Sequence, residues 1–271
     1  MITLLTSERF IVSGLVLFGP RWKAPLARTL GVTRETVSRW VSEGDVPPWA
    51  CNTVALLVRS KGSVLSLYDK TTNMVRPWAD AGFECFCVDV QHPDGEHRKG
   101  NITTIGADIK TWLPPPRRYA IVFGFPPCTN LAVSGARWFQ AKGMHGLTDG
   151  LEMVEACRRI CDWGQAPWMI ENPVSTLASY WRKPDYTFHP KDFGGWVGGE
   201  NDGYSKRTCL WIGGGFRLPQ KRPIPELRPL FIHHLPPSKD RANLRSETPR
   251  GFARAIFEAN VGRNMMSATG A

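Results

Sequence analysis

The first sixty residues carry apolar side chains at helical spacing, in short runs that are interrupted by glycine or proline. Such spacing is typical of amphipathic helices, and Gly and Pro are the residues that commonly end them. The pattern predicts a small all-α domain over residues 1–60, joined to the rest of the chain by a linker at residues 60–63. Its four expected helices cover residues 7–18, 23–30, 34–42 and 48–59.

From residue 63 onward, short runs of β-branched and aromatic residues alternate with helical patterns. This alternation favours a mainly parallel sheet with helices on both faces. We therefore predict an α/β, Rossmann-like domain over residues 63–262, within which residues 174–240 form an irregular, aromatic and basic region. Strands are expected at residues 63–69, 83–90, 121–124, 168–171 and 204–211, and helices at residues 73–81, 151–163 and 249–260.

Three further stretches are expected to lack regular structure. Residues 92–100 are polar and predict a surface loop, and residues 129–139 predict a flexible lid. Glycines at 143, 146 and 150 are expected to break the chain before the next helix. Residues 219–237 are rich in proline and predict extended backbone.

Residues 26–40 combine the features of a helix-turn-helix. Gly31 suits the tight turn, Thr33 suits the cap of the second helix, and Val37 and Trp40 fall on its inward face.

This stretch resembles the helix-turn-helix of phage and bacterial repressors. The resemblance places Arg34 and Arg39 on a recognition helix, where they contact DNA. A helical bundle that serves only packing or dimerisation is the alternative.

A candidate nucleophile follows the strand at residues 121–124. Pro126 and Pro127 stop that strand and stiffen the extended turn that leads to Cys128. In an open α/β sheet, ligands gather at the carboxyl ends of the strands, so a thiol there is well placed for nucleophilic catalysis. A cysteine that only fills space in the core is the alternative.

Two motifs in this part of the chain resemble one enzyme family. Residues 124–128, Gly-Phe-Pro-Pro-Cys, are similar to the Pro-Pro-Cys motif of the DNA (cytosine-5) methyltransferases. Residues 170–173, Ile-Glu-Asn-Pro, are similar to the family's Glu-Asn-Val motif, and their spacing suits a strand, helix, strand unit. The resemblance implies a methyltransferase fold over residues 63–262 in a divergent, phage-type member of the family.

The resemblance also implies a covalent mechanism on cytosine. Cys128 adds to carbon 6 of a base flipped out of DNA, Glu171 shares a proton with ring nitrogen 3, and Arg207 holds the carbonyl oxygen or the adjacent phosphate. Further substrate contacts are expected from Pro127, Ser134, Asn172 and Lys206, with Arg34 and Arg39 added by the N-terminal module.

The cofactor implied by the family is S-adenosylmethionine. Asp89 stands where an acid binds the ribose hydroxyls, and Asp108 resembles the aspartate that contacts the adenine amino group. Pro126 is expected to line the same pocket. A strand-end turn and a helix cap are the alternative roles of the two aspartates.

The loop after the first strand departs from the family pattern. A glycine-rich loop is expected there, but residues 66–73 contain no glycine. Glycine lets the backbone approach a ligand, so this loop changes the donor pocket. The pocket residues it supplies are Tyr68, Asp69, Lys70 and Asn73.

The altered loop leaves the donor open. Methylene-tetrahydrofolate, with its carboxylate on Lys70, is an alternative donor that gives 5-hydroxymethylcytosine. Two further hypotheses are a catalytically silent DNA-binding regulator and an enzyme that acts on free nucleotides. The intact Cys128 and Glu171 oppose the regulator.

The composition of the chain predicts the kind of partner that it binds and the cellular compartment in which it works. The 271 residues carry a formal net charge of +10, which favours a polyanionic partner, nucleic acid before membrane. The seven cysteines are scattered without metal-ligand spacing, which predicts no metal and a reducing cytoplasm, that of a bacterium or a phage-infected host. No apolar span of 18 residues and no export signal are visible.

Overall fold

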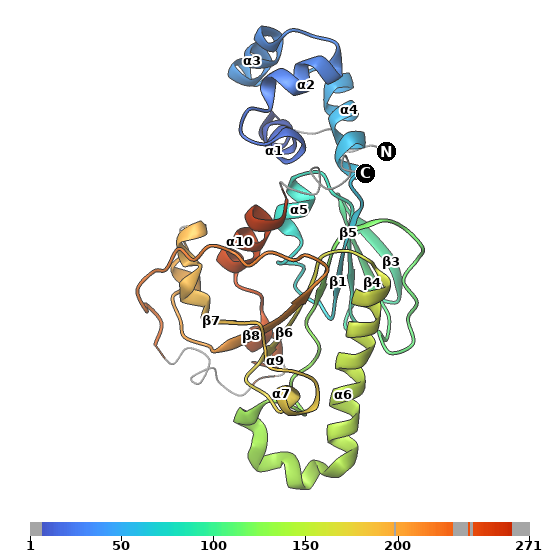
Figure 1. The fold of residues 1–271 in the computed structure, drawn as a ribbon, viewed down its shortest axis with the longest axis vertical. Helices are drawn as coiled ribbons and strands as arrows, with labels where there is room; N and C mark the ends of the chain where they lie inside the picture. The colour runs from blue at the N-terminus through green and yellow to red at the C-terminus, as the bar shows by residue number, and fades with distance from the viewer. Residues whose placement is uncertain (1–6, 198, 230–237, 239–240, 262–271) are drawn as a thin grey trace.

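The computed structural model describes residues 7–197, 199–229, 238 and 241–261 (Figure 1). The ends of the expected domains, at residues 1–6 and 262, therefore lie outside the described residues. The same holds for residue 198 and residues 230–237 and 239–240 of the irregular region, which include the end of the proline-rich stretch.

The four expected N-terminal helices are confirmed. They are α1 (Ser7–Phe18), α2 (Lys23–Leu30), α3 (Arg34–Glu43) and α4 (Pro48–Arg59). Gly31 caps α2 in the left-handed region at φ 70°, and the Thr33 hydroxyl accepts the backbone N–H of Thr36 at 3.1 Å to begin α3. Val37 and Trp40 are buried as expected, so the local geometry of a helix, turn and helix is present.

An eight-stranded sheet forms the rest of the molecule, in the order β3-β4-β2-β1-β5-β6-β8-β7. The parallel part runs from β4 to β6, and its strands appear in the spatial order third, second, first, fourth, fifth, which is the Rossmann arrangement. The predicted α/β, Rossmann-like fold is therefore confirmed. The parallel strands are β1 (Ser63–Leu67), β2 (Cys85–Val88), β4 (Ile102–Gly106), β5 (Tyr119–Gly124) and β6 (Trp168–Pro173).

Three strands are antiparallel to their neighbours. β8 (Thr208–Gly213) pairs with β6 and with β7 (Tyr186–Phe188), and β3 (Gly95–Lys99) pairs with β4 at the opposite edge. The surface loop expected at residues 92–100 was wrong, because residues 95–99 form this edge strand. Every residue of β3 is exposed, so it has none of the apolar alternation that marks a half-buried strand.

Side chains alternate between two cores along each strand. Val64, Ile121 and Phe123 pack with α5 (Arg76–Asp80) and α10 (Arg250–Asn260) on one face. Leu65 and Val122 pack with α6 (Phe139–Trp163) on the other. The predicted helix at residues 73–81 is present but shorter, and the predicted closing helix is confirmed.

Helix α6 begins earlier than expected. Of the three glycines, only Gly143 interrupts it, with φ 61°. Gly150 is a packing residue, because an added Cβ would lie 3.0 Å from Leu131. The lid expected at residues 129–139 contains a 3-10 helix, Val133–Trp138. Directly before that helix, Ala132 forms a β-bridge with Ser175, in the segment that follows β6.

Helices α1 to α4, which we call the helical unit, pack on the amino end of the sheet (Figure 1). Ser13 of α1 is buried and donates to the carbonyl of Ala81, directly after α5, at 2.9 Å. An added Cβ at Gly82 would contact Ser13 and Val58 at 3.6 and 3.7 Å. Apolar residues of α1 to α4 and of the sheet face share one core. The remaining helices are α7 (Leu177–Tyr180) and α9 (Arg241–Ser246).

Candidate active site

Cys128 lies at the carboxyl end of β5 on a constrained loop. Gly124 is the last residue of β5, and the position requires glycine because an added Cβ would meet the Cys157 sulfur at 2.1 Å. Pro126 is buried and Pro127 is exposed. The Cys128 carbonyl accepts the N–H groups of Leu131 and Ala132 at 3.0 and 2.8 Å. Cys128 is half-buried, whereas the other six cysteines are buried, so it is the thiol that a substrate can reach.

Glu171 and Asn172 lie on the next parallel strand, at the same edge of the sheet. Asn172 donates to the carbonyl of Pro126 at 3.0 Å and so ties its strand to the Cys128 loop. Glu171 Oε1 and Asn172 Oδ1 are buried and have no hydrogen-bond partner among the described residues. Such atoms are costly, and they commonly mark the place of a ligand.

Lys206 and Arg207 are the basic pair that precedes β8. Their side chains point to opposite faces of the sheet, because side chains alternate along a strand. Lys206 and Thr208 point to the face that holds Glu171, where they line one cavity. Arg207 and Cys209 point to the opposite face and line another. Of the two basic residues predicted to contact the substrate, Lys206 therefore shares a cavity with Glu171 and Arg207 does not.

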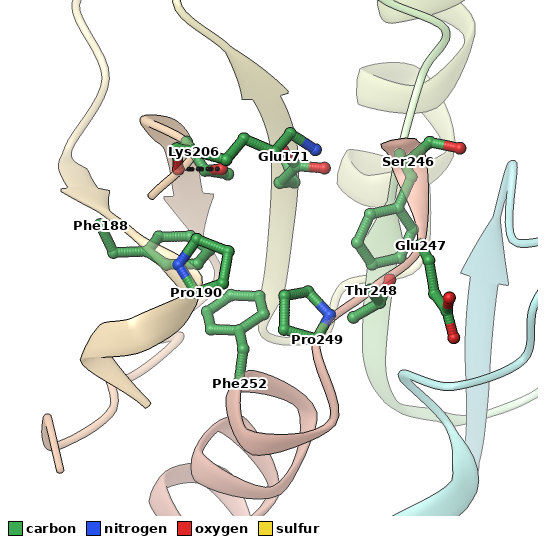
Figure 2. Close-up of a pocket in the computed structure, with 11 residues that line it drawn as sticks. Glu171, Phe188, Pro190, Lys206, Ser246, Glu247, Thr248, Pro249 and Phe252 are labelled. Carbon is green, nitrogen blue, oxygen red and sulfur yellow. Dashed lines mark hydrogen bonds between the residues drawn. The ribbon is translucent and has the colours of Figure 1, made fainter. Parts of the chain in front are cut away.

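The cavity beside Glu171 is narrow (Figure 2). Figure 2 shows Glu171 and Lys206 facing residues 246–249, which we call the closing segment, above the rings of Phe188 and Phe252. The dashed line is the Thr208 hydroxyl donating to the Lys206 carbonyl at 3.2 Å. A cavity of about 10 Å³ holds roughly one water molecule, so a larger ligand does not fit it in this conformation.

Charges around the cavity act on both titratable groups. Burial raises the pKa of Glu171, and the nearby Lys206 ammonium lowers it. Burial raises the pKa of the Cys128 thiol, and the Glu171 carboxylate adds to the rise. Lys206 and Arg245 lower the pKa of Cys128. The Lys206 ammonium also donates to the carbonyl of Arg245 at 3.0 Å, so it is held beside the site.

The glycine-free loop after β1 adopts a glycine-like backbone. Tyr68 and Thr72 lie in the left-handed region at φ 57° and 61°, which is uncommon for residues with a Cβ. The buried Asp69 carboxylate holds the loop, because it accepts the Ser66 hydroxyl at 2.8 Å and the Thr72 N–H at 2.7 Å. Asp69 therefore fixes the loop instead of facing a ligand.

Two other predicted donor contacts are also used within the protein. Lys70 is exposed, and its ammonium donates to the carbonyl of Gln91. Asn73 is buried and donates to Glu247 Oε1 at 2.8 Å and to the Thr248 carbonyl at 3.3 Å. Asn73 thus connects the β1 loop to the closing segment, which was not among the predicted site residues. The polar run before the last helix was the signal that could have found it.

Acidic side chains surround Tyr68 at the carboxyl ends of β1, β2 and β4. Burial raises the pKa of Tyr68, and Asp108, Asp149 and Asp89 add to the rise because their charges lie near its hydroxyl. Asp89 is buried and accepts the N–H of Gln91 at 2.7 Å. Asp108 is exposed and accepts the N–H of Lys110 at 3.0 Å. Both aspartates make turn contacts, and the charge of each also acts on Tyr68.

The remaining predicted residues lie apart from this cluster. Ser134 is exposed on the 3-10 helix that follows the Cys128 loop. Arg34 and Arg39 are exposed on α3, in the helical unit at the amino end of the sheet. The carboxyl edge thus gathers Cys128, Glu171 and Lys206, and the recognition residues are elsewhere.

Comparisons with known proteins reach little beyond the fold. No family model matches the sequence, and no curated protein matches it. Among solved structures, the chain is similar to the CcbJ methyltransferase from Streptomyces caelestis, with 15% identity and a TM-score of 0.25. The match covers 49% of this chain and 52% of that one, so the chain spans about half the length of this neighbour. A likeness this distant carries no argument about activity, which has to come from the site.

The described residues lack two features, a membrane-spanning helix and a metal-binding cluster. None of the helices there combines the length and apolar character needed to cross a membrane. That part of the chain also holds no group of three or more His, Cys, Asp or Glu residues placed to bind a metal ion.

Proposed function

We propose that the protein is a DNA cytosine carbon-5 methyltransferase that uses S-adenosylmethionine. One observation carries the proposal: a reachable thiol, Cys128, lies at the same sheet edge as Glu171, whose buried Oε1 has no partner among the described residues. Lys206 lies close enough to act on the charge of both. A nucleophile, a proton carrier and a cation are the three groups that this chemistry needs.

Cys128 is the proposed nucleophile. Its thiolate forms a bond to carbon 6 of cytosine, and the electron pair of the 5,6 double bond moves to make carbon 5 nucleophilic. After carbon 5 has taken a methyl group, loss of its proton to water and departure of the thiolate restore the aromatic ring and the free enzyme. Burial raises the pKa of the Cys128 thiol and so favours its protonated form. The thiol therefore gives its proton to water as the thiolate forms, and the nearby positive charge of Lys206 stabilises that thiolate.

Glu171 is the proposed proton carrier. Addition of the thiolate pushes negative charge toward ring nitrogen 3, and a protonated carboxyl can donate there. The raised pKa of Glu171 suits this role, since it increases the protonated fraction near neutral pH. Asn172 points to the opposite face of β6 and holds the Cys128 loop through the Pro126 carbonyl, so its role in this proposal is to position that loop. Lys206 takes the place assigned to Arg207 and binds the carbonyl oxygen.

The acidic cluster fits the proposed cofactor. S-adenosylmethionine supplies a methyl group on a positively charged sulfur when it is bound. Asp89, Asp108 and Asp149 provide negative charge around Tyr68, and carboxylates of this kind accept ribose hydroxyls and an adenine amino group. Asp69, Lys70 and Asn73 are left out of the proposed contacts, because their side chains already bind the protein itself.

The folate alternative has less support. It needs Lys70 to lie in a donor pocket, but Lys70 is exposed and lines neither of the two cavities described at this edge of the sheet. A silent DNA-binding protein has no use for an unpaired buried carboxyl oxygen at Glu171, which carries an energetic cost. We therefore keep methyl transfer to DNA as the proposal, with the net charge of +10 and the exposed Arg34 and Arg39 supporting DNA as the partner.

Mass spectrometry of nucleosides tests the proposal. Plasmid DNA from cells that express the wild-type protein should contain 5-methylcytosine, and DNA from cells that express Cys128→Ala should not. Cys51→Ala is the matched control, since Cys51 is buried in α4 and lines neither cavity. A 5-hydroxymethylcytosine signal would point to the folate donor, and unmodified DNA from the wild type would contradict the proposal.

A further inference from the structure

A second cavity opens at the same edge of the sheet, on the face opposite Glu171. Its volume is about 150 Å³, which is enough for a benzene-sized ring. The cavity is lined by Ser175, Ala178, Thr187, Arg207, Cys209 and Trp211.

This cavity is adjacent to the proposed active site, across the start of β8. Thr208 lines the Glu171 cavity, and its chain neighbours Arg207 and Cys209 line the second one, so the start of β8 separates the two. Ser175 follows Glu171 by four positions and bridges to Ala132, near the Cys128 loop. Two groups that are joined by a short backbone could therefore occupy the two cavities together.

The chemistry of the second cavity suits a flat ring with an attached anion. Trp211 forms part of the wall and is stacked on Trp181, with ring centroids 5.9 Å apart and planes 17° apart. Arg207 is exposed at this cavity, and it makes no hydrogen bond or ion pair with any other described residue. Its charge lowers the pKa of Cys209, against the rise caused by burial, so the guanidinium lies near the cavity wall.

We infer that this cavity binds the base next to the target cytosine in the same DNA strand, with Arg207 on the phosphate between them. The inference rests on the proposed function. It gives Arg207 a contact to the DNA backbone in place of the contact to the target base, and the apolar wall accepts a base face without reading its edges.

Binding of single-stranded DNA tests the inference without catalysis. The ligand is a labelled strand of 12 nucleotides, all thymidine except one central cytidine, and affinity is measured by fluorescence anisotropy. An abasic residue at one immediate neighbour of the cytidine should weaken binding to the wild type by about tenfold. The side on which this happens, 5′ or 3′, identifies the bound neighbour. An abasic residue two positions away should have a much smaller effect.

Two variants isolate the cavity. Ala178→Trp fills it and should make binding insensitive to the abasic neighbour. Arg207→Gln keeps an exposed polar side chain and should reduce the slope of log affinity against log salt by about 0.7, the value for one phosphate of a single strand. Lys99→Gln, on the exposed edge strand β3 at the far side of the sheet, is the control and should leave the slope unchanged.

The outcomes separate the inference from the proposed function. An equal abasic effect in wild type and Ala178→Trp, no abasic effect at either neighbour, or an unchanged slope in Arg207→Gln would overturn the inference. Methylation of plasmid DNA by the wild type would leave the proposed function standing in each of those cases. An abasic effect that Ala178→Trp abolishes, together with the reduced slope, supports the inference.

Discussion

At the scale of single residues, the negative charge of Glu171 disfavours ionisation of the Cys128 thiol in the resting protein. Each is taken out of water, and the carboxylate of one raises the pKa of the other. Lys206 offsets this effect, since its positive charge lowers both pKa values. The reactivity of the thiol should therefore report directly on its two charged neighbours.

Timed alkylation of Cys128 by iodoacetamide at pH 8 measures that reactivity. Glu171→Gln removes a negative charge, lowers the pKa of the thiol and should speed alkylation by roughly threefold, because the thiolate is the reacting form. Lys206→Met removes the positive charge and should slow it by a similar factor. Mass spectrometry of the Cys128 peptide gives the rates, and the six buried cysteines serve as internal controls. Equal rates in all three proteins would contradict this electrostatic account.

Glu171 should also make stability depend on pH. Its pKa is raised in the folded state, so the folded protein binds more protons than the unfolded chain just above the ordinary pKa of a carboxyl. Stability is then lost as pH rises from that ordinary value through the raised one. Glu171→Gln removes this loss and should increase Tm at pH 7.5 by on the order of 2 °C, with little change at pH 4. Scanning calorimetry at both pH values tests this, and an equal increase at pH 4 would exclude ionisation as its cause.

The sequence predicted Cys128 and Glu171 better than it predicted their basic partner. Both residues follow strands whose apolar runs are easy to recognise, and the carboxyl ends of parallel strands meet at one edge. The choice between Lys206 and Arg207 depends on where β8 enters the sheet and which face its first residue takes. The face to which each residue of β8 points is set by the pairing of β8 with β6 and β7, and no local sequence pattern encodes that pairing.

At the scale of elements, the loop after β1 shows how a backbone usually built with glycine is held without it. Asp69 supplies the hydrogen bonds that keep Thr72 in the left-handed region. The sequence could show that glycine was missing, but it could not show that the backbone shape was retained. This loop therefore keeps a tight turn while carrying side chains in place of glycines.

Substitutions in that loop should have opposite effects on stability. Thr72→Gly relieves a left-handed conformation that costs about 1–2 kcal/mol, and after the entropy of glycine it should raise the free energy of unfolding by roughly 0.5–1 kcal/mol. Asp69→Ala leaves buried donors unpaired and should lower the free energy of unfolding by about 3 kcal/mol. Urea denaturation followed by tryptophan fluorescence measures both. A destabilised Thr72→Gly would show that the threonine side chain itself holds the loop.

Errors in predicting elements also have physical causes. Strand β3 was missed because all of its residues are exposed, and pairing with β4 alone holds it in the sheet. The break expected at Gly150 was wrong because that glycine allows close contact with Leu131 inside a continuous helix. Glycine acts through its conformation at Gly143 and through its small size at Gly150, and the sequence alone does not distinguish these uses.

At the scale of the whole molecule, the net charge of +10 should appear in the salt dependence of DNA binding. If α3 contacts duplex phosphates through Arg34 and Arg39, the double variant Arg34→Gln/Arg39→Gln should reduce the slope of log affinity against log salt by about 1.8. Anisotropy with a duplex of 30 base pairs at several salt concentrations measures the slope. An unchanged slope would favour the alternative in which the helical unit serves packing, and an unchanged rate of Cys128 alkylation confirms that the site is intact.

If the proposed function holds, the position of the helical unit at the amino end of the sheet restricts where a modified base can fall. Helix α4 and strand β1 follow one another along the long axis of the molecule and together extend over roughly 35 Å, about one turn of B-form DNA. A duplex that touches both α3 and Cys128 therefore has to run lengthwise along the protein. The methylated cytosine would lie at a constant offset of about ten base pairs from the bases that α3 contacts, so the enzyme would act as a molecular ruler.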